Sequence, residues 1–377
     1  MEAYKAYKFR LYPTDNQKVL IHKTFGCVRF VYNHFLDYQK NNGFKKSSYL
    51  CKDLKVLNNE YEFLKEVDSC ALRCAIFNLE DAYKNFFAKR GNYPVFKGKR
   101  SYQSYKTNCI VSSYKNNTYS NIKVDLNKRQ IKLPKLGLVD IKGYRNKKKL
   151  EGRIISATII KEATGKYYVS VIVEEEAIIK EKVIPSKAIG IDLGVKDLVI
   201  TSDYEKYDNK KIIAKYEKRL KRLQRELARR EKGGKNYNKT KLKIARLHEK
   251  IRNTRKHYLN KIANEIVLEN DIIVTENLKV RDMSKNKRLA KYILDASFSK
   301  LCSLLEWKSK LQGKFYYKID TYYPSSQICS YCGHKDTSLK DLSIREYKCQ
   351  SCGKELDRDI NASINILFEG LKLHYQN

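Results

Sequence analysis

Three acidic residues stand far apart in this sequence, and four cysteines lie between the second and the third. Asp192 and Glu276 each follow a short apolar segment, and Asp359 stands where a helical apolar pattern begins. Carboxylates this widely separated can bind the same metal ions only if the fold brings two strands and a helix together. This requirement constrains the fold more than any other feature of the chain.

The segments around the acids predict a particular order of strands and helices. Two apolar strands joined by a tight turn come first, and a strongly basic helical hairpin follows. A strand before Glu276, a helix, another strand, the cysteine segment and a last helix complete the order. The expected ranges are 188–195, 198–202, 210–262 with a break at 232–235, 271–275, 295–312, 316–322 and 359–374. This is the order of an RNase H-like fold, in which the three carboxylates meet at one edge of a sheet.

The chemistry predicted for this edge is metal-assisted cleavage of phosphodiesters. Two Mg²⁺ ions about 3.5–4 Å apart, or two Mn²⁺ ions, would clamp the attacking and leaving oxygens. Carboxylate oxygens are the hard ligands that such ions require. Each acid taken alone could equally be a turn cap or a surface charge. Asp359 is itself a candidate N-cap, and spacing leaves Asp357 open as the third ligand in its place.

The cysteine segment has the spacing of a zinc ribbon. Two Cys-x-x-Cys pairs are separated by 16 residues, and Gly333 and Gly353 follow them directly. Four thiolates complete a tetrahedral shell, so the zinc is expected to be structural. His334 is the alternative ligand, although an exposed or supporting position is expected for it. The predicted ligands are Cys329, Cys332, Cys349 and Cys352.

The charge of the chain points to a polyanionic partner. The 377 residues include 78 Lys and Arg against 42 Asp and Glu, a net charge of +36. A field of this sign attracts nucleic acid, although a generically basic protein such as a ribosomal one has the same balance. The 29 Tyr favour base stacking beside the cations, and an AT-rich genome would raise Tyr as well. The basic hairpin is expected to face nucleic acid rather than solvent alone.

The first half of the chain predicts a sheet interrupted by helices. Residues 1–12 alternate as a strand does, and helices are expected over 16–38, 48–58 and 69–90. Short alternating segments then favour a small β-barrel that includes the first strand, which makes the helical block an insertion. The expected strands are 122–126, 130–133, 138–141, 154–161 and 167–174.

The remaining cysteines and the chain start bear on the compartment. No apolar run follows the charged residues 1–5, and no stretch is apolar enough to span a membrane. A cytoplasmic protein with reduced thiols and no membrane partner is therefore expected, in the cytosol or nucleoid of a prokaryote. Six scattered cysteines are expected to be small core residues: Cys27, Cys51, Cys70, Cys74, Cys109 and Cys302.

Ordered motifs along nearly the whole chain resemble the TnpB family, the transposon-encoded RNA-guided nucleases related to type V CRISPR effectors. They include YKFRLYP, RFVYN and KLPKLG in the first half, and GIDLG, ENL and DRDINA around the three acids. The motif positions are 7–13, 29–33, 78–87, 94–97, 132–137, 190–194, 276–278, 323–333 and 357–362.

The resemblance implies an α+β multidomain chain. Its expected parts are a β-barrel wedge domain, an inserted helical recognition domain, an RNase H-like RuvC nuclease domain with a basic helical insertion, and a zinc-ribbon insert that binds the target. In that order the expected ranges are 1–13 with 93–185, 14–92, 186–322 with 356–377 and the insertion at 205–262, and 323–355.

The resemblance also implies an activity and partners. Asp192, Glu276 and Asp359 would be the catalytic and Mg²⁺-binding residues of an RNA-guided DNA endonuclease that cuts beside a short target-adjacent motif. Its partners would be a guide RNA from the transposon end and double-stranded DNA, with protein partners unknown. A strand-transferring transposase and a non-cleaving RNA-guided regulator remain the alternatives. Nucleic-acid contacts are expected at Tyr323, Ser325, Ser326, Gln327 and Arg358.

Overall fold

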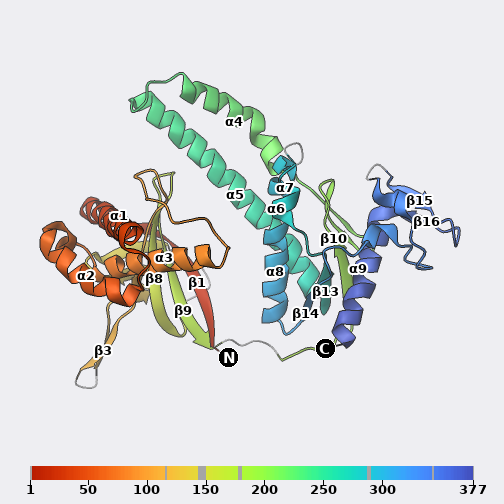
Figure 1. Ribbon diagram of the computed structural model, residues 1–377, viewed down its shortest axis with the longest axis horizontal. Coiled ribbons are helices and arrows are strands. Elements are labelled where there is room, and N and C mark those ends of the chain that lie inside the picture. Colours follow the sequence, from red (N-terminus) through yellow and green to blue (C-terminus); the bar gives the residue numbers. More distant parts are fainter. Residues whose placement is uncertain are drawn as a thin grey trace. The chain divides into compact units, whose positions relative to one another are not determined.

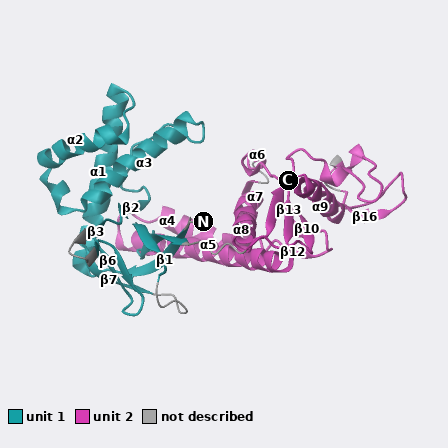
Figure 2. Cartoon of the chain, turned by 90° about the horizontal axis from the view of Figure 1, so that it is seen from below, with its two compact units in different colours: residues 1–177 teal, residues 178–377 magenta. Residues whose placement is uncertain are grey.

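The computed structural model describes residues 2–114, 117–142, 150–176, 181–286, 290–341 and 344–376. The chain mixes helices and sheets and divides into two compact units, residues 1–177 and 178–377 (Figure 2). The finer division into four domains remains a prediction. No helix among the described residues has the length and apolar character needed to cross a membrane.

Unit 1 contains a seven-stranded antiparallel sheet with β1 (Glu2–Tyr12) near its middle. The alternating pattern of β1 places Tyr7, Phe9 and Leu11 in the buried core of the unit. The order runs from edge strand β2 to edge strand β5, so the described residues form an open sheet where the sequence predicts a barrel. The order is β2 (Gln103–Asn108), β8 (Arg153–Lys161), β9 (Tyr167–Glu176), β1, β7 (Gly137–Lys142), β6 (Gln130–Leu133) and β5 (Lys123–Asp125).

Three helices lie between β1 and β2 in the chain: α1 (Asp15–Asn42), α2 (Ser47–Glu60) and α3 (Ser69–Phe87). Thr14 and Gln17 form a capping box at the start of α1, which satisfies free backbone N–H groups there. The three helices were predicted, but α3 ends before residue 90 because Lys89 adopts a left-handed φ of 54°. Strand β2 and the hairpin of β3 (Val111–Tyr114) and β4 (Asn117–Ser120) were not predicted.

Unit 2 is built on a five-stranded sheet (Figure 1). Its central strand β10 pairs antiparallel with β11 and parallel with β13, and β13 pairs parallel with β14. The register places Ile191 opposite Thr275, so the residues that follow them leave the same edge of the sheet. The order is β12 (Lys206–Asp208), β11 (Asp197–Thr201), β10 (Ala188–Asp192), β13 (Ile272–Thr275) and β14 (Phe315–Lys318).

The connections of unit 2 correct several predicted ranges. The predicted helix 295–312 is two helices, because Ser297 between them adopts a left-handed φ of 56°. The insertion predicted from residue 205 begins with the short strand β12, and the predicted strand 316–322 is the shorter β14. The helices are α4 (Ile212–Ala228), α5 (Lys235–Glu269), α6 (Val280–Met283), α7 (Ala290–Ala296), α8 (Phe298–Leu311) and α9 (Arg358–Tyr375).

Helix α9 packs very closely against the sheet. A Cβ added at Gly190 would lie 2.1 Å from the Ser363 carbonyl oxygen, and one at Gly370 would lie 2.3 Å from a methyl carbon of Val274. Ser363 itself is fully buried. Glycine at these two positions therefore lets the helix approach the strands, which brings the start of α9 to the edge where β10 and β13 end.

Candidate active site and cysteine cluster

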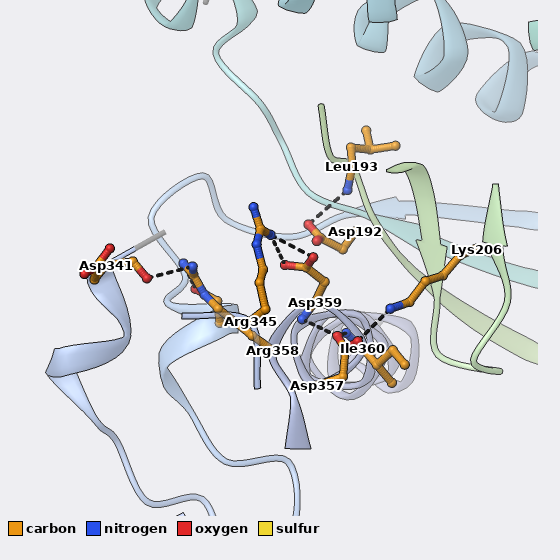
Figure 3. Close-up of polar contacts among 10 residues, drawn as sticks. Asp192, Leu193, Lys206, Asp341, Arg345, Asp357, Arg358, Asp359 and Ile360 are labelled. Carbon is orange, nitrogen blue, oxygen red and sulfur yellow. Dashed lines mark hydrogen bonds and ion pairs between the residues drawn. The ribbon is translucent and has the colours of Figure 1, made fainter. Parts of the chain in front are cut away.

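The fold brings the three predicted acids to one place. Asp192 is the last residue of β10, Glu276 directly follows β13, and Asp359 lies in the first turn of α9. All three side chains are half-buried. Figure 3 shows the carboxylates of Asp192 and Asp359 pointing toward one another. Residues from two parallel strands and one helix thus form a single acidic site.

The acids of this site repel one another. Burial, and then the charges of Glu276 and Asp359, raise the pKa of Asp192 well above its ordinary value. Burial also raises the pKa of Glu276, against a hydrogen bond that Ser325 Oγ donates to its carboxylate at 2.7 Å. Such a set of carboxylates holds a proton more readily than a lone acid, and a cation placed between them would relieve the repulsion.

The structure distinguishes Asp357 from Asp359. Asp357 is the N-cap of α9, accepting hydrogen bonds from the backbone N–H groups of Asp359 and Ile360 at 2.9 and 3.1 Å. It also forms an ion pair with Lys206 at 2.6 Å. Burial opposes ionisation, but these contacts lower the pKa of Asp357. The N-cap considered for Asp359 is therefore wrong, because its neighbour holds that position and Asp359 is left to face the other acids.

Asp359 has a cationic partner that sequence analysis did not identify. Arg345 Nη1 lies 3.2 and 3.0 Å from the two carboxylate oxygens of Asp359 (Figure 3). Arg345 lies in the cysteine segment, between the two Cys-x-x-Cys pairs, so this segment supplies a cation to the acidic site. No motif or spacing pointed to it, since it is one of many basic residues in this chain.

The four predicted zinc ligands form one cluster. Their sulfur atoms all lie within 4.8 Å of one another. The separations are 3.7 Å for Cys329 and Cys352 and 3.6 Å for Cys332 and Cys349. Four sulfurs at about 2.3 Å from a tetrahedral Zn²⁺ ion lie about 3.8 Å apart, so this set fits zinc. Backbone N–H groups, that of Cys352 foremost, lower the pKa of Cys349 and so favour its thiolate.

Two equivalent turns build the cluster. Gly333 N donates to Cys329 O, and Gly353 N donates to Cys349 O, each at 2.9 Å. These glycines have φ of 74° and 70°, a conformation that other residues rarely adopt. His334, the alternative ligand, is exposed and is not a member of the cluster. Strands β15 (Glu346–Lys348) and β16 (Glu355–Asp357) lead into and out of the second turn.

Two asparagines attach residues 323–355, here called the cysteine module, to the helix that carries Asp359. Asn361 accepts from Ser330 N at 2.8 Å and donates to Ile328 O at 2.7 Å. Asn365, one turn later, donates to Ser325 O and to Ile328 O at 2.8 and 2.6 Å. Both side chains are buried. The sequence does contain a signal for this attachment, namely two amide side chains four residues apart in the apolar face of a helix. Buried polar groups require partners, so such a pair indicates contact with another segment.

The residues predicted to contact nucleic acid are not a common exposed surface. Ser325 is buried against Glu276, while Tyr323, Ser326 and Gln327 are half-buried. Arg358 is only 5% exposed, and its guanidinium donates to Asp341 O at 3.0 Å and lies 3.5 Å from Ser326 Oγ. Arg358 therefore has contacts inside the module, and its contact with nucleic acid stays a prediction.

Helices α4 and α5 form the predicted hairpin (Figure 1), which joins along an apolar seam that includes Leu223 and Leu247. The acids of α4 are already paired, Glu217 with Lys221 and Lys291, and Glu226 with Arg230. Six exposed cations lie mostly three or four positions apart, with one adjacent pair, and this spacing places all six on one side of the helix. They have no ion-pair partner in the described part of the chain: Lys215, Lys218, Arg219, Arg222, Arg225 and Arg229.

Family models match three parts of the chain. A model described as "Probable transposase" matches residues 168–287, and a "Cas12f1-like, TNB domain" matches residues 298–366. A "Helix-turn-helix domain" matches residues 1–42, which fold here as strand β1 and the long helix α1.

Relatives and solved structures match the chain over most of its length. A "Putative RNA-guided DNA endonuclease" of Streptomyces pristinaespiralis is 35% identical over 97% of this chain and 89% of the relative. "Putative RNA-guided DNA endonuclease InsQ" of Escherichia coli strain K12 is 32% identical, over 98% of this chain and 93% of the relative.

The fold is similar to that of a chain in the Cas12f1–sgRNA–target DNA complex, with a TM-score of 0.53, 15% identity, and 97% and 98% coverage. The mini-RNA-guided endonuclease CRISPR-Cas_phi3 gives a TM-score of 0.50 at 10% identity, over 98% and 92%. At these identities the likeness concerns the fold alone. The sequence identities over nearly the whole chain lead to one conclusion: this chain belongs to the TnpB family.

Proposed function

We propose that this chain is an RNA-guided endonuclease that hydrolyses DNA phosphodiesters at the site formed by Asp192, Glu276 and Asp359. The observation that carries the proposal is the convergence of these acids from β10, β13 and α9, in a chain 35% identical to a relative with that name. The strand order of unit 2 supports an RNase H-like domain of the RuvC type.

The donor set fits Mg²⁺ or Mn²⁺. It offers carboxylate oxygens, which such ions prefer. The raised pKa of Asp192 reflects burial and then the neighbouring negative charges, which cations would offset. When bound, a pair of such ions supplies an activated water and charge stabilisation for phosphodiester hydrolysis. Ser325 holds the Glu276 carboxylate in place, and Arg345 lies on Asp359. The cysteine cluster would hold one structural Zn²⁺ that fixes the module carrying Ser325 and Arg345.

The nucleic-acid partners proposed are a guide RNA from the transposon end and a double-stranded DNA target beside a short motif. The row of unpaired cations on α4 supports this, because phosphate contacts by Lys and Arg provide most sequence-independent affinity. Base pairing with the guide would then supply sequence recognition. The cysteine module is proposed to act on the target strand near the acids, to which Arg345 already links it.

The test is cleavage by purified protein with the RNA that copurifies with it. Sequencing this RNA defines the guide, and a DNA duplex matched to the guide should be cut in Mg²⁺. Asp192→Ala should abolish the cut and leave RNA binding largely intact. Joining of the DNA to transposon ends would indicate a transposase, and guided binding without any cut would indicate a regulator. Undiminished cleavage by Asp192→Ala would refute the assigned site.

A further inference from the structure

Unit 1 contains a pocket that the proposed function has not used. It has a volume of about 360 Å³, and it is formed by α1, α3, β2, β8 and the segment before β2.

 A volume of 360 Å³ lies within the range of pockets that bind small ligands or a single nucleotide unit.

The pocket gathers three cations without an acid. Arg29 of α1, Lys97 of the segment before β2, and Lys106 of β2 line it. No carboxylate stands among its described lining residues, and none of these three cations has an ion-pair partner in the part of the chain that the structure describes. Asp68, the N-cap of α3, does not line the pocket and accepts a hydrogen bond from Cys70 N. Like charges held together without a counter-ion favour binding of an anion.

Lys97 is held in place before any ligand arrives. Asn33 Nδ2 donates to Lys97 O at 3.0 Å, and Lys97 N donates to Asn33 Oδ1 at 2.8 Å. The ammonium lies 3.7 Å from the centroid of the buried Tyr32 ring. Burial lowers the pKa of Lys97, which an anionic ligand would raise again. Both the backbone and the charge of Lys97 are therefore positioned, which reduces the entropy lost on binding.

The other groups of the pocket fit a nucleotide. Asn78, Gln103 and Ser104 offer hydrogen-bonding groups in the lining, and the Tyr102 ring is 70% exposed at the same site. Guanidinium and ammonium groups bind phosphate, and an exposed aromatic ring can stack on a base. We propose that this pocket binds a phosphate group, with its nucleoside, of a nucleic-acid strand. The inference rests on the proposed function only in taking the phosphate from a nucleic acid.

The test replaces the charges one at a time. Lys97→Met and Lys106→Met keep the aliphatic stem, and Lys99→Met is the matched control, since Lys99 is exposed on the same segment and does not line the pocket. The probe is a fluorescently labelled RNA–DNA hybrid duplex, titrated at several salt concentrations. Each pocket variant should bind roughly tenfold more weakly and lose about 0.9 from the salt slope, with an unchanged unfolding midpoint. The control should bind nearly as wild type.

A second arm identifies the source of the phosphate. Inorganic phosphate and adenosine monophosphate are titrated into the wild type and Lys97→Met. Saturable binding of these small ligands that Lys97→Met loses would assign the pocket to a free nucleotide. No saturable binding of them, together with weakened binding of the hybrid duplex, would assign the pocket to a nucleic-acid strand. Equal affinities for the pocket variants and Lys99→Met in both arms overturn the inference. If the wild type still cuts guided DNA in that case, the proposed function stands and only the pocket inference falls.

Discussion

The acidic site and the cysteine cluster of unit 2 are assembled in opposite ways. The four sulfurs come from two short turns of the same kind, each closed by a glycine and each formed by neighbours in the chain. The three carboxylates come from two strands and a helix, and burial together with their mutual repulsion raises the pKa of Asp192. The comparison teaches that local geometry can build a structural metal site, whereas the acidic site depends on long-range packing.

The two sites are nevertheless connected. Asn361 and Asn365 hold the cysteine module on α9, and Ser325 of that module holds Glu276. Loss of the local site should therefore disturb the distant one, while loss of an acid should leave the cysteine cluster intact. The following predictions test this asymmetry.

The largest effect is expected from Cys349→Ser. Structural zinc sites contribute on the order of 10 kcal/mol in isolated zinc-finger peptides, and a missing thiolate removes much of it. The variant should lose its zinc, measured by elemental analysis, and its guided cleavage. Cys302→Ser, outside the cluster, is the control. Full zinc content in Cys349→Ser would contradict the ligand set.

Asp359→Asn and Asp357→Asn should differ sharply. The first should lower the cleavage rate by at least roughly a thousandfold, because a metal-binding carboxylate is lost. The second keeps an N-cap, since Asn serves as well as Asp, and loses only the ion pair with Lys206, which is worth at most about 1 kcal/mol. It should cleave within roughly tenfold of the wild type. The reverse ranking would make Asp357 the third ligand. Zinc content should be normal in both variants.

Asn365→Leu should weaken the link between the two sites. It leaves the carbonyl oxygens of Ser325 and Ile328 without this donor, at a cost of about 1–3 kcal/mol each at most. The unfolding midpoint and the cleavage rate should both fall. Lys372→Met, which breaks only a surface pair on the same helix, is the control. In the Cys349→Ser background the additional effect should be small, and an undiminished effect there would argue against the proposed connection.

The smallest effect is expected for Asp192→Asn, on the unfolding midpoint of the protein in buffer without divalent ions. The folded pKa of Asp192 is raised, so the unfolded chain releases its proton near pH 4 while the folded chain retains it. Stability from this group therefore falls as the pH rises from about 4 to the folded pKa. Asparagine removes the loss, and the unfolding midpoint in magnesium-free buffer at pH 7 should rise by a few degrees. Below about pH 4 the two proteins should match. A lower midpoint for the variant at pH 7 would contradict this account.

Predictability from sequence followed the range of the interactions. The alternation of β1, the helices of unit 1 and the cysteine spacing are local patterns, and the structure contains each of them. The break at Ser297 and the end of α3 at Phe87 were missed, because single left-handed residues interrupt otherwise helical patterns. Strands β15 and β16 were missed as well, since three residues are too few to show a period.

The sequence by itself determined the residue types that the chemistry requires: acids after apolar strands, paired cysteines followed by glycine, and a large excess of cations. Tertiary structure alone decided that Asp357 and not Asp359 caps the helix, and that Arg345 contacts Asp359. It also decided that three cations share one pocket. The physical reason is that spacing along a chain specifies geometry only over a few residues. The pairing of Ile191 with Thr275 and the close approach at Gly190 depend on packing between distant segments.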